Sequence, residues 1–402
     1  MEIGRQTELA VIETHPVQYH APVYRCLEQQ FGIHTTAIYG SDFSVVGSLD
    51  REFGRLIAWD SDLLSGYSSL FLSRVKDGGD ASPEKLSGHS VSAALRRANP
   101  KAVLLPGYSL SFYRNAFVSA LRAHAPIIFR GETTDHARRR CAAKTWLRDR
   151  LLGYFYKRCD ALLYIGVRSR DHFQRFETAV AGKLFYSPYC VDTSSAHPDE
   201  EARLRFRPLQ RRRLQIRAGQ IVLLFSGKLS RRKGTDLLVT AVGQLPPDLR
   251  RQVIIVFLGS GEMDVFLKQL AAETGVETRF VGFQNQTQLS PYYHAADLLV
   301  LPSRHSETWG LVINEALHHG LPCVVSDAVG CRPDLILEGV TGETAADWSG
   351  SGLASAIQRA IPLTGRPEIR QLCRERVKAY SVQNAAGGIA EAYRFVARPL
   401  RR

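Results

Sequence analysis

The stretch that decides the fold reads SETWGLVINEALHHGLPCVVSD (Ser306–Asp327). It follows a short apolar run at Leu298–Leu301, and a second apolar run, Cys323–Val325, lies near its end. Between the two runs, Gly310 opens a predicted helix that ends near Gly320. A buried strand, a helix and another buried strand in this order are typical of a parallel crossover, so this stretch predicts one unit of an open α/β sheet.

The same alternation extends over almost the whole chain. Apolar runs that are typical of buried parallel strands occur at Leu9–Ile12, Thr35–Tyr39, Ala102–Leu105, Ile127–Phe129 and Leu162–Ile165, and again at Ile221–Phe225, Val253–Leu258, Arg279–Val281, Leu298–Leu301 and Cys323–Val325. A proline- and arginine-rich segment, Ser187–Gln220, separates the two sets. We therefore predict an α/β protein with two Rossmann-like, doubly wound parallel-sheet domains at residues 1–190 and 220–380, a linker at 191–219 and a C-terminal segment at 381–402. Ligands of such proteins bind at the carboxyl ends of the strands, here between the domains.

Length and composition agree with this layout and exclude several classes of protein. A chain of 402 residues fits two domains of about 100–200 residues, and 45% hydrophobic with 23% charged residues is ordinary for a globular protein. The longest apolar runs are far shorter than the ~20 residues of a membrane span, and the first residues lack a signal-peptide pattern. Seven scattered cysteines without a CxxC spacing fit reduced thiols. We expect a cytoplasmic protein, peripheral at the inner membrane face if its basic surface binds lipid.

The positive charge is concentrated in two segments of a chain whose net charge is +13. Ala137–Arg158 has eight basic residues and one acidic residue, and Arg203–Arg217 has seven arginines and no acidic residue, so the remainder is close to neutral. For Ala137–Arg158 we predict contact with an anionic membrane, with a solvated basic helix as the alternative. For Arg203–Arg217 we expect a solvated helix or loop, with anion binding as the alternative.

A glycine- and lysine-containing loop follows the predicted strand Ile221–Phe225. It reads SGKLSRRKG (Ser226–Gly234), and a predicted helix begins directly after it. Gly227 permits a tight turn, and Lys228 and Lys233 bring positive charge to the N-terminus of that helix. These cations, the free N–H groups and the helix dipole suit a diphosphate, whereas the alternative is a solvated basic loop.

Two glutamates flank the start of the helix in the fold-deciding stretch. Gly310 frees the backbone there, so the N–H groups of Gly310, Leu311 and Val312 can face an anion. Glu315, one turn into the helix, can accept both hydroxyls of a ribose, and Glu307, in the preceding loop, can reach a sugar beyond the diphosphate. Such a pair of glutamates is common by chance, but its combination with the lysine-containing loop is not.

These motifs resemble those of the retaining GT-B glycosyltransferases of glycosyltransferase family 4. The family's GR-x4-KG loop corresponds to Gly227–Gly234 and its E-x7-E signature to Glu307 and Glu315, and the similarity covers about residues 220–393. The resemblance implies that Lys228 and Lys233 bind the donor diphosphate, that Glu307 contacts the transferred sugar and that Glu315 holds the ribose. It also implies donor contacts from Gly227, Phe283, Trp309, Gly310, Leu311 and Val312. Lys228 stands where the family usually has arginine, so we expect the same role with looser geometry.

The N-terminal half resembles a polysaccharide-type branch that opens with HPxQY. The motif is His15–Tyr19 here, and Trp59–Tyr67 continues the likeness. A cluster of His, Gln and Tyr at the end of a strand suits the recognition of hydroxyl groups. We therefore predict that His15, Gln18 and Tyr19 line the acceptor site, with capping of the following helix as the alternative.

Two charged residues follow the predicted strand Ile127–Phe129. Many members of the family place a histidine here, facing the donor sugar, whereas this chain has Arg130 or Gly131 at that point and His136 further on. We predict Arg130 and Glu132 in the acceptor site. A structural ion pair between them is the alternative.

The resemblance implies a GT-B enzyme whose last helix, about Val382–Val396, packs back on the N-terminal domain. We expect transfer of a hexosyl group, with retention, from a nucleotide sugar, expected to be a UDP-sugar, to a hydroxyl of a glycan, lipid-linked or small-molecule acceptor. Glu307, Lys228 and Lys233 are the predicted catalytic residues. No cofactor and no metal is expected, because the lysines and the helix N-terminus take the place of the ion. A GT-B phosphorylase or epimerase is the alternative enzyme. A nucleic-acid-binding protein is the alternative from another class, but the near-neutral remainder argues against a nucleic-acid partner.

Overall fold

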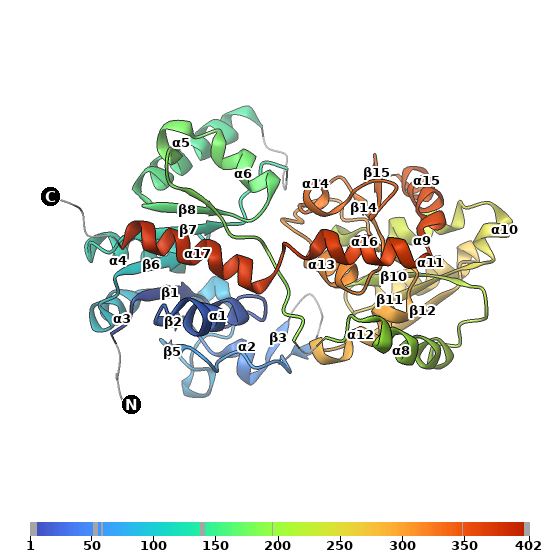
Figure 1. The fold of residues 1–402 in the computed structure, drawn as a ribbon, viewed down its shortest axis with the longest axis horizontal. Helices are drawn as coiled ribbons and strands as arrows, with labels where there is room; N and C mark the ends of the chain where they lie inside the picture. Colours follow the sequence, from blue (N-terminus) through green and yellow to red (C-terminus); the bar gives the residue numbers. More distant parts are fainter. Residues whose placement is uncertain are drawn as a thin grey trace.

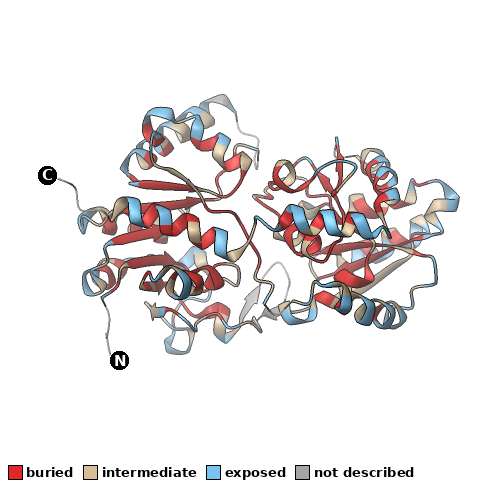
Figure 2. Ribbon diagram, viewed as in Figure 1, coloured by how far each residue is buried: buried red, intermediate tan, exposed pale blue. Residues whose placement is uncertain are grey.

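The computed structural model describes residues 6–50, 55–57, 59–136, 141–194, 196–347 and 349–397. The chain forms two α/β domains that lie side by side, each built around a parallel sheet (Figure 1). Buried residues follow the strands in both domains, and exposed positions are most frequent on the outer helices (Figure 2). The predicted fold class, two Rossmann-like parallel-sheet domains, is therefore confirmed.

The N-terminal domain contains a seven-stranded sheet in the order β5-β2-β1-β6-β7-β8-β9. Its strands are β1 (Leu9–Glu13), β2 (Thr35–Tyr39), β5 (Ser68–Phe71), β6 (Ala102–Leu105), β7 (Ile127–Gly131), β8 (Ala161–Tyr164) and β9 (Leu184–Tyr186), and β3 (Ser48–Asp50) and β4 (Arg55–Ile57) form a separate antiparallel pair. Its helices are α1 (Ala21–Phe31), α2 (Phe43–Val46), α3 (Val91–Ala98), α4 (Ser111–Arg122), α5 (Ala142–Arg158), α6 (Val167–Gln174) and α7 (Glu177–Val180). Because β1 has β2 on one side and β6 on the other, the winding reverses there, and ligands of such sheets bind at this point.

The C-terminal domain contains a six-stranded sheet in the order β12-β11-β10-β13-β14-β15. Its strands are β10 (Ile221–Ser226), β11 (Val253–Leu258), β12 (Thr278–Gly282), β13 (Leu298–Leu301), β14 (Cys323–Ser326) and β15 (Gly342–Ala345). Its helices are α9 (Thr235–Gly243), α10 (Pro247–Arg250), α11 (Asp264–Thr274), α12 (Ser290–Ala295), α13 (Leu311–His318), α14 (Arg332–Leu335), α15 (Gly350–Ala360) and α16 (Pro367–Val377). The winding reverses at β10, which pairs with β11 and β13. All six residues of β11 are buried, as expected for a parallel strand with helices on both faces of its sheet.

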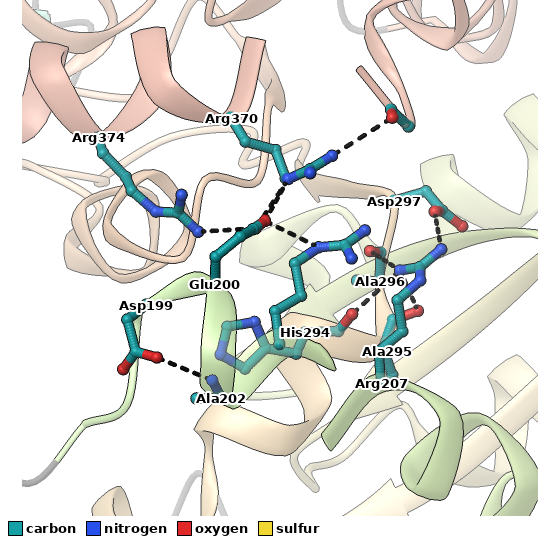
Figure 3. Close-up of polar contacts among 12 residues, drawn as sticks. Asp199, Glu200, Ala202, Arg207, His294, Ala295, Ala296, Asp297, Arg370 and Arg374 are labelled. Atoms are coloured by element: carbon teal, nitrogen blue, oxygen red, sulfur yellow. Dashed lines mark hydrogen bonds and ion pairs between the residues drawn. The ribbon is translucent and has the colours of Figure 1, made fainter. Parts of the chain in front are cut away.

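The arginine-rich stretch forms a helix, α8 (Glu200–Arg213), that packs against the C-terminal domain (Figure 3). Arg207 donates hydrogen bonds to the backbone carbonyls of residues 294–296 at distances of 2.8–3.2 Å and pairs with Asp297 at 2.5 Å. The carbonyls at the end of α12 carry the negative end of its dipole, which explains the cation placed there. The expectation of a solvated segment is thus wrong for Arg207 and for Arg211, which also pairs with Asp297.

The last helix, α17 (Val382–Val396), lies against the N-terminal domain rather than against the domain that precedes it in sequence (Figure 1). Its backbone accepts a hydrogen bond at Ala385 from the hydroxyl of Ser187, at 2.8 Å. The Tyr393 hydroxyl donates to Glu8 at 3.2 Å, next to the start of β1. The chain therefore crosses between the domains twice within the described residues, before α8 and before α17.

Candidate functional site

The loop between β10 and α9 carries the two predicted phosphate-binding lysines. Gly227 follows β10 directly, and Lys228 and Lys233 lie half-buried in the loop. Gly234 ends the loop with a φ of +69°, and a Cβ there would lie 2.1 Å from the carbonyl oxygen of Pro302, so only glycine fits. This close approach brings the lysine loop against the loop that follows β13.

Glu307 lies in that second loop and is buried beside Lys233. The Lys233 ammonium is 2.5 Å from Glu307 Oε2, and the hydroxyl of Ser303 donates to the same oxygen at 2.8 Å. Arg232 Nη1 is 4.0 Å from it. Two of the three predicted catalytic residues, Glu307 and Lys233, therefore form one ion pair, and Lys228 lies in the same loop as Lys233.

A second ion pair holds the two loops together. Arg304 donates two hydrogen bonds to the carboxylate of Asp236, at 2.6 and 2.8 Å, and a third to the backbone carbonyl of Arg231 at 2.8 Å. Burial raises the pKa of Asp236, but the contacts with Arg304 lower it more, so the net shift is downward. This pair therefore stays charged at neutral pH. The position of Lys233 relative to Glu307 is therefore fixed by side chains that are not part of the candidate site.

Helix α13 begins at the predicted anion-binding position. Gly310 has a φ of +99°, and a Cβ there would lie 3.1 Å from the side chains of Leu301 and Val329. Leu311 and Val312 form the first turn, whose N–H groups have no acceptor within the helix. They remain available to a phosphate, together with the positive end of the helix dipole.

Trp309 differs from its predicted place in the donor site. Its side chain is only 3% exposed, and its indole N–H donates to Asn314 at 2.8 Å. Its ring packs near Tyr189 and Tyr380, with ring centroids 6.0 and 5.8 Å away. Trp309 therefore fills the space beneath the site, and its buried ring cannot offer a surface to a ligand.

Glu315, the predicted ribose acceptor, is buried and accepts three hydrogen bonds. Tyr293 donates to Oε2 at 2.5 Å, and Gln286 and Tyr19 donate to Oε1 at 3.2 and 3.4 Å. Burial raises the pKa of Glu315, and these donors oppose the shift. Sequence reasoning did not identify Gln286 and Tyr293, although both lie in the Gly282–Ser303 stretch that carries the family resemblance.

Tyr19 comes from the N-terminal domain, so its bond to Glu315 crosses between the domains. A cavity of about 210 Å³ adjoins this contact and is lined by Gln18, Tyr19, Asp60 and Gln286. The HPxQY motif and the segment that begins at Trp59 therefore meet in one interdomain cavity. Gln18 Oε1 is buried there without a hydrogen-bond partner. The rings of Trp59 and Phe283, one from each domain, are 6.3 Å apart, so Phe283 also lies at the interface.

The remaining predicted acceptor residues separate into different roles. Glu132 accepts a hydrogen bond from Thr308 at 3.1 Å, directly beside Glu307 and across the domain boundary. His15 is paired with the Thr14 hydroxyl at 2.9 Å, and burial lowers the pKa of His15 to about 4, so it is neutral at pH 7.

Arg130 does not face the predicted acceptor site. It is only 5% exposed and donates to Ser187 and Pro188, at 3.0 Å to the Ser187 hydroxyl and 2.9 Å to the Pro188 carbonyl. Its acceptor role is therefore corrected to anchoring the chain after β9. The alternative of an ion pair with Glu132 is also wrong, since each residue has a different partner.

Sequence reasoning did not identify a buried histidine–carboxylate pair at the end of β1. His20 Nδ1 is 2.5 Å from Glu13 Oε1, and the second oxygen of Glu13 is buried without a partner. His20 directly follows the HPxQY motif, which is the sequence signal that could have drawn attention to it. Within the part of the chain that the structure describes, no three His, Cys, Asp or Glu side chains gather as a candidate metal site.

Comparisons with known proteins identify similar sequences and similar folds. Residues 206–379 match the family described as "Glycosyl transferases group 1". The matched segment contains the whole six-stranded sheet of the C-terminal domain. The match begins inside α8, in agreement with the packing of that helix on the C-terminal domain.

Two curated relatives illustrate the extent of the similarity. The D-inositol 3-phosphate glycosyltransferase of Saccharomonospora viridis is 33% identical over 226 residues, which cover 52% of this chain and 51% of that protein. The lipopolysaccharide 1,2-N-acetylglucosaminetransferase of Salmonella typhimurium is 29% identical over 219 residues, covering 52% and 55%. The aligned part thus spans about half the length of these relatives.

Solved structures match over nearly the whole chain. Anabaena Alr3699/HepE in complex with UDP superposes with a TM-score of 0.70 at 18% identity and covers 96% of this chain and 98% of its own. A glycosyltransferase from Rickettsia africae has a TM-score of 0.68 at 12% identity and covers 98% and 100%. These matches establish the GT-B fold for both domains.

Proposed function

We propose that this protein is a retaining glycosyltransferase that moves a hexosyl group from a nucleotide sugar to an acceptor hydroxyl. One observation carries the proposal: the buried Lys233–Glu307 pair lies beside the N-terminus of α13, which carries Glu315 one turn further on. Diphosphate, sugar and ribose would each find a group of matching chemistry there. The group 1 match and the fold shared with a UDP complex support this assignment, and a UDP-sugar is the donor we expect.

The chain's own groups account for the chemistry. Negative charge develops on the diphosphate as the sugar leaves, and Lys228, Lys233 and the N–H groups of α13 would stabilise it through preorganised electrostatics. Because these cations supply the charge that a divalent ion supplies in other enzymes, we expect activity without a metal. Glu307 would contact the sugar, and the donor phosphate would take the proton of the acceptor hydroxyl on the same face. A double displacement through Glu307 is the alternative route to retention.

The outer face of α5 supports peripheral binding to an anionic membrane. Trp146, Leu147, Leu151 and Tyr154 are between 55% and 64% exposed, and Leu147, Leu151 and Tyr154 lie at helical spacing on one side. Arg150 lies over the ring of Trp146 and Arg158 over that of Tyr154, within 5.1 and 4.9 Å of the ring centroids. The helix thus presents apolar side chains with cations beside them, the pattern of interfacial helices.

The proposed contact segment, Ala137–Arg158, extends beyond this helix. Residues 137–140 of it lie outside the described residues. Among the helices that the structure describes, none has the length and apolarity to span a bilayer.

The donor site can be tested by thermal shift and calorimetry with UDP, GDP, ADP and TDP, each with and without EDTA. We expect one nucleotide, UDP, to stabilise the protein equally in both conditions. Glu315→Ala should abolish this stabilisation, whereas Glu273→Ala, a change at an exposed position of α11, should preserve it. If none of the four nucleotides binds to wild-type protein, the donor-site assignment fails.

A further inference from the structure

An apolar groove lies between α4 and α5, on the N-terminal domain and away from the donor site. Its volume is about 480 Å³. Its lining includes Tyr108, Tyr113, Phe117, Val118, Leu152 and Phe155. Phe155 lies at the centre of this aromatic wall, with its ring 4.6 Å from that of Phe117 and 5.0 Å from that of Phe129. A groove of this size and composition can cover a hydrocarbon chain.

The inner end of the groove adjoins the strand ends that face the C-terminal domain. Tyr113 contributes its ring to the groove, and its hydroxyl lies near Thr14, which directly follows β1. The carboxylates of Glu13 and Glu132 lie near enough to raise the pKa of Tyr113 further, beyond the main effect of burial. Glu132 in turn bonds Thr308 beside Glu307. Oxygen acceptors therefore gather at this end, where hydroxyl groups of a ligand would find partners.

The outer end of the groove is continuous with the exposed apolar face of α5. Leu151, which is 64% exposed, belongs both to that face and to the groove lining. Two arginines, Arg114 and Arg148, also line the groove, and Arg114 directly follows Tyr113 in α4, toward the inner end. Arg148 is paired with Asp135 at 3.2 Å, while Arg114 is exposed. An apolar channel with an exposed cation toward its inner end is complementary to an amphiphile whose anionic group lies between its hydrocarbon chain and its head.

We propose that the α4–α5 groove binds the hydrocarbon chain of an anionic, lipid-linked acceptor, whose hydroxyl-bearing head extends past Tyr113 toward Glu307. The proposal rests on the glycosyltransferase function proposed above and selects one of the three acceptor classes that the sequence left open. The chain would leave the bilayer at the apolar face of α5 and enter the groove at Leu151. Arg114 would face the anionic linkage.

The first test uses butyl phosphate and octyl phosphate below its micellar concentration as soluble probes, with binding measured by calorimetry in the absence of any membrane. Each buried methylene contributes about 0.8 kcal/mol, so the four added methylenes raise affinity by up to about 200-fold. We expect octyl phosphate to bind at least 10-fold more tightly than butyl phosphate. Equal affinities for the two probes would overturn the proposal.

A matched pair of variants locates the probe. Val118→Trp places an indole in the groove from a position that is 41% exposed, whereas Val265→Trp makes the same change on α11, at a position that is 80% exposed and outside the groove. We expect Val118→Trp to weaken octyl phosphate binding at least 10-fold and Val265→Trp to leave it unchanged. Thermal unfolding and UDP binding of both variants verify that they fold. Equal octyl phosphate binding in the two folded variants would overturn the assignment.

Vesicle sedimentation separates chain binding from general membrane contact. Leu147→Asp alters the exposed face of α5 without altering the groove lining, so it should reduce binding to phosphatidylglycerol vesicles and preserve octyl phosphate binding. If Leu147→Asp abolishes both, the groove is only part of a membrane-docking face and the proposal fails. If octyl phosphate binds as expected but no nucleotide does, the donor site is refuted while the groove stands.

Discussion

Lys233 is the residue at which the donor-site assignment can be tested most directly. Lys233→Met removes the ammonium group and keeps an unbranched chain of similar length. In the structure this ammonium is 2.5 Å from Glu307, and the two side chains are only 15% and 10% exposed. The substitution therefore leaves a buried carboxylate without its nearest cation.

The expected loss of stability follows from the partners that remain. Removing one member of a buried ion pair costs about 3–5 kcal/mol when the other is left unpaired. Glu307 keeps the Ser303 hydroxyl at 2.8 Å and Arg232 at 4.0 Å, so we expect a smaller cost, about 2 kcal/mol. For a domain of this size that corresponds to a decrease in Tm of about 4–8 °C.

The expected loss of donor affinity is larger. A hydrogen bond to a charged group contributes about 1.5–3 kcal/mol, or about 10- to 150-fold in Kd. The unpaired Glu307 would also repel the diphosphate, so we expect UDP to bind about 100-fold more weakly. Calorimetric titration measures this, with Arg231→Met as the control because Arg231 is an exposed cation in the same loop. A Kd for Lys233→Met within twofold of wild type would refute the placement of the diphosphate at this loop.

Three further changes test other parts of the site. Glu307→Gln should lower kcat by about 100-fold or more with little change in UDP affinity, as steady-state kinetics and calorimetry would measure, because the lost charge acts mainly in the transition state. Gly166→Ala should cost about 1–3 kcal/mol of stability, measured by denaturant unfolding, since the new methyl would lie 2.3 Å from the ring of Trp309 across the domain boundary. Tyr293→Phe removes a hydrogen-bond donor to Glu315. Burial already raises the pKa of this carboxyl group in the folded protein, and loss of the donor should raise it further. A carboxyl group whose pKa is higher in the folded than in the unfolded protein lowers the free energy of unfolding as the pH rises between these two pKa values. The free energy of unfolding, measured between pH 4 and 7, should therefore fall more steeply with pH for this variant than for wild type.

Most of the fold could be predicted because parallel strands buried on both faces leave continuous apolar runs. Every strand predicted from such a run is present. Five strands, β3, β4, β5, β9 and β15, were not predicted, and for β5 and β15 the reason is identifiable. β5 reads SSLF at the sheet edge, where none of its residues is fully buried. β15 reads GETA and is buried throughout, but Glu343 within it pairs with Arg359, so its burial rests on an ion pair rather than on apolar side chains.

The candidate site was predictable in one domain and only partly in the other. A phosphate cradle depends on a loop and the helix that follows it, so Lys233, Glu307 and Glu315 could be placed from local sequence. The contacts of Tyr19 with Glu315 and of Glu132 with Thr308 join residues 296 and 176 positions apart. No local pattern encodes such pairs, because they exist only once both sheets have formed and the domains meet.

The two basic segments show why charge alone did not decide function. Both carry a net charge of +7 in sequence. On α8, however, Arg207 and Arg211 pair with Asp297, and Arg207 also donates hydrogen bonds to the carbonyls at the end of α12. On α5, by contrast, Arg150 and Arg158 lie over exposed aromatic rings. The difference follows from the neighbours of each cation, since an arginine facing its own domain finds acceptors there, whereas one beside exposed apolar side chains has an external surface to meet. Arg205, Arg212 and Arg213 on α8 remain exposed, so the feature that distinguishes α5 is the apolar groove that it borders.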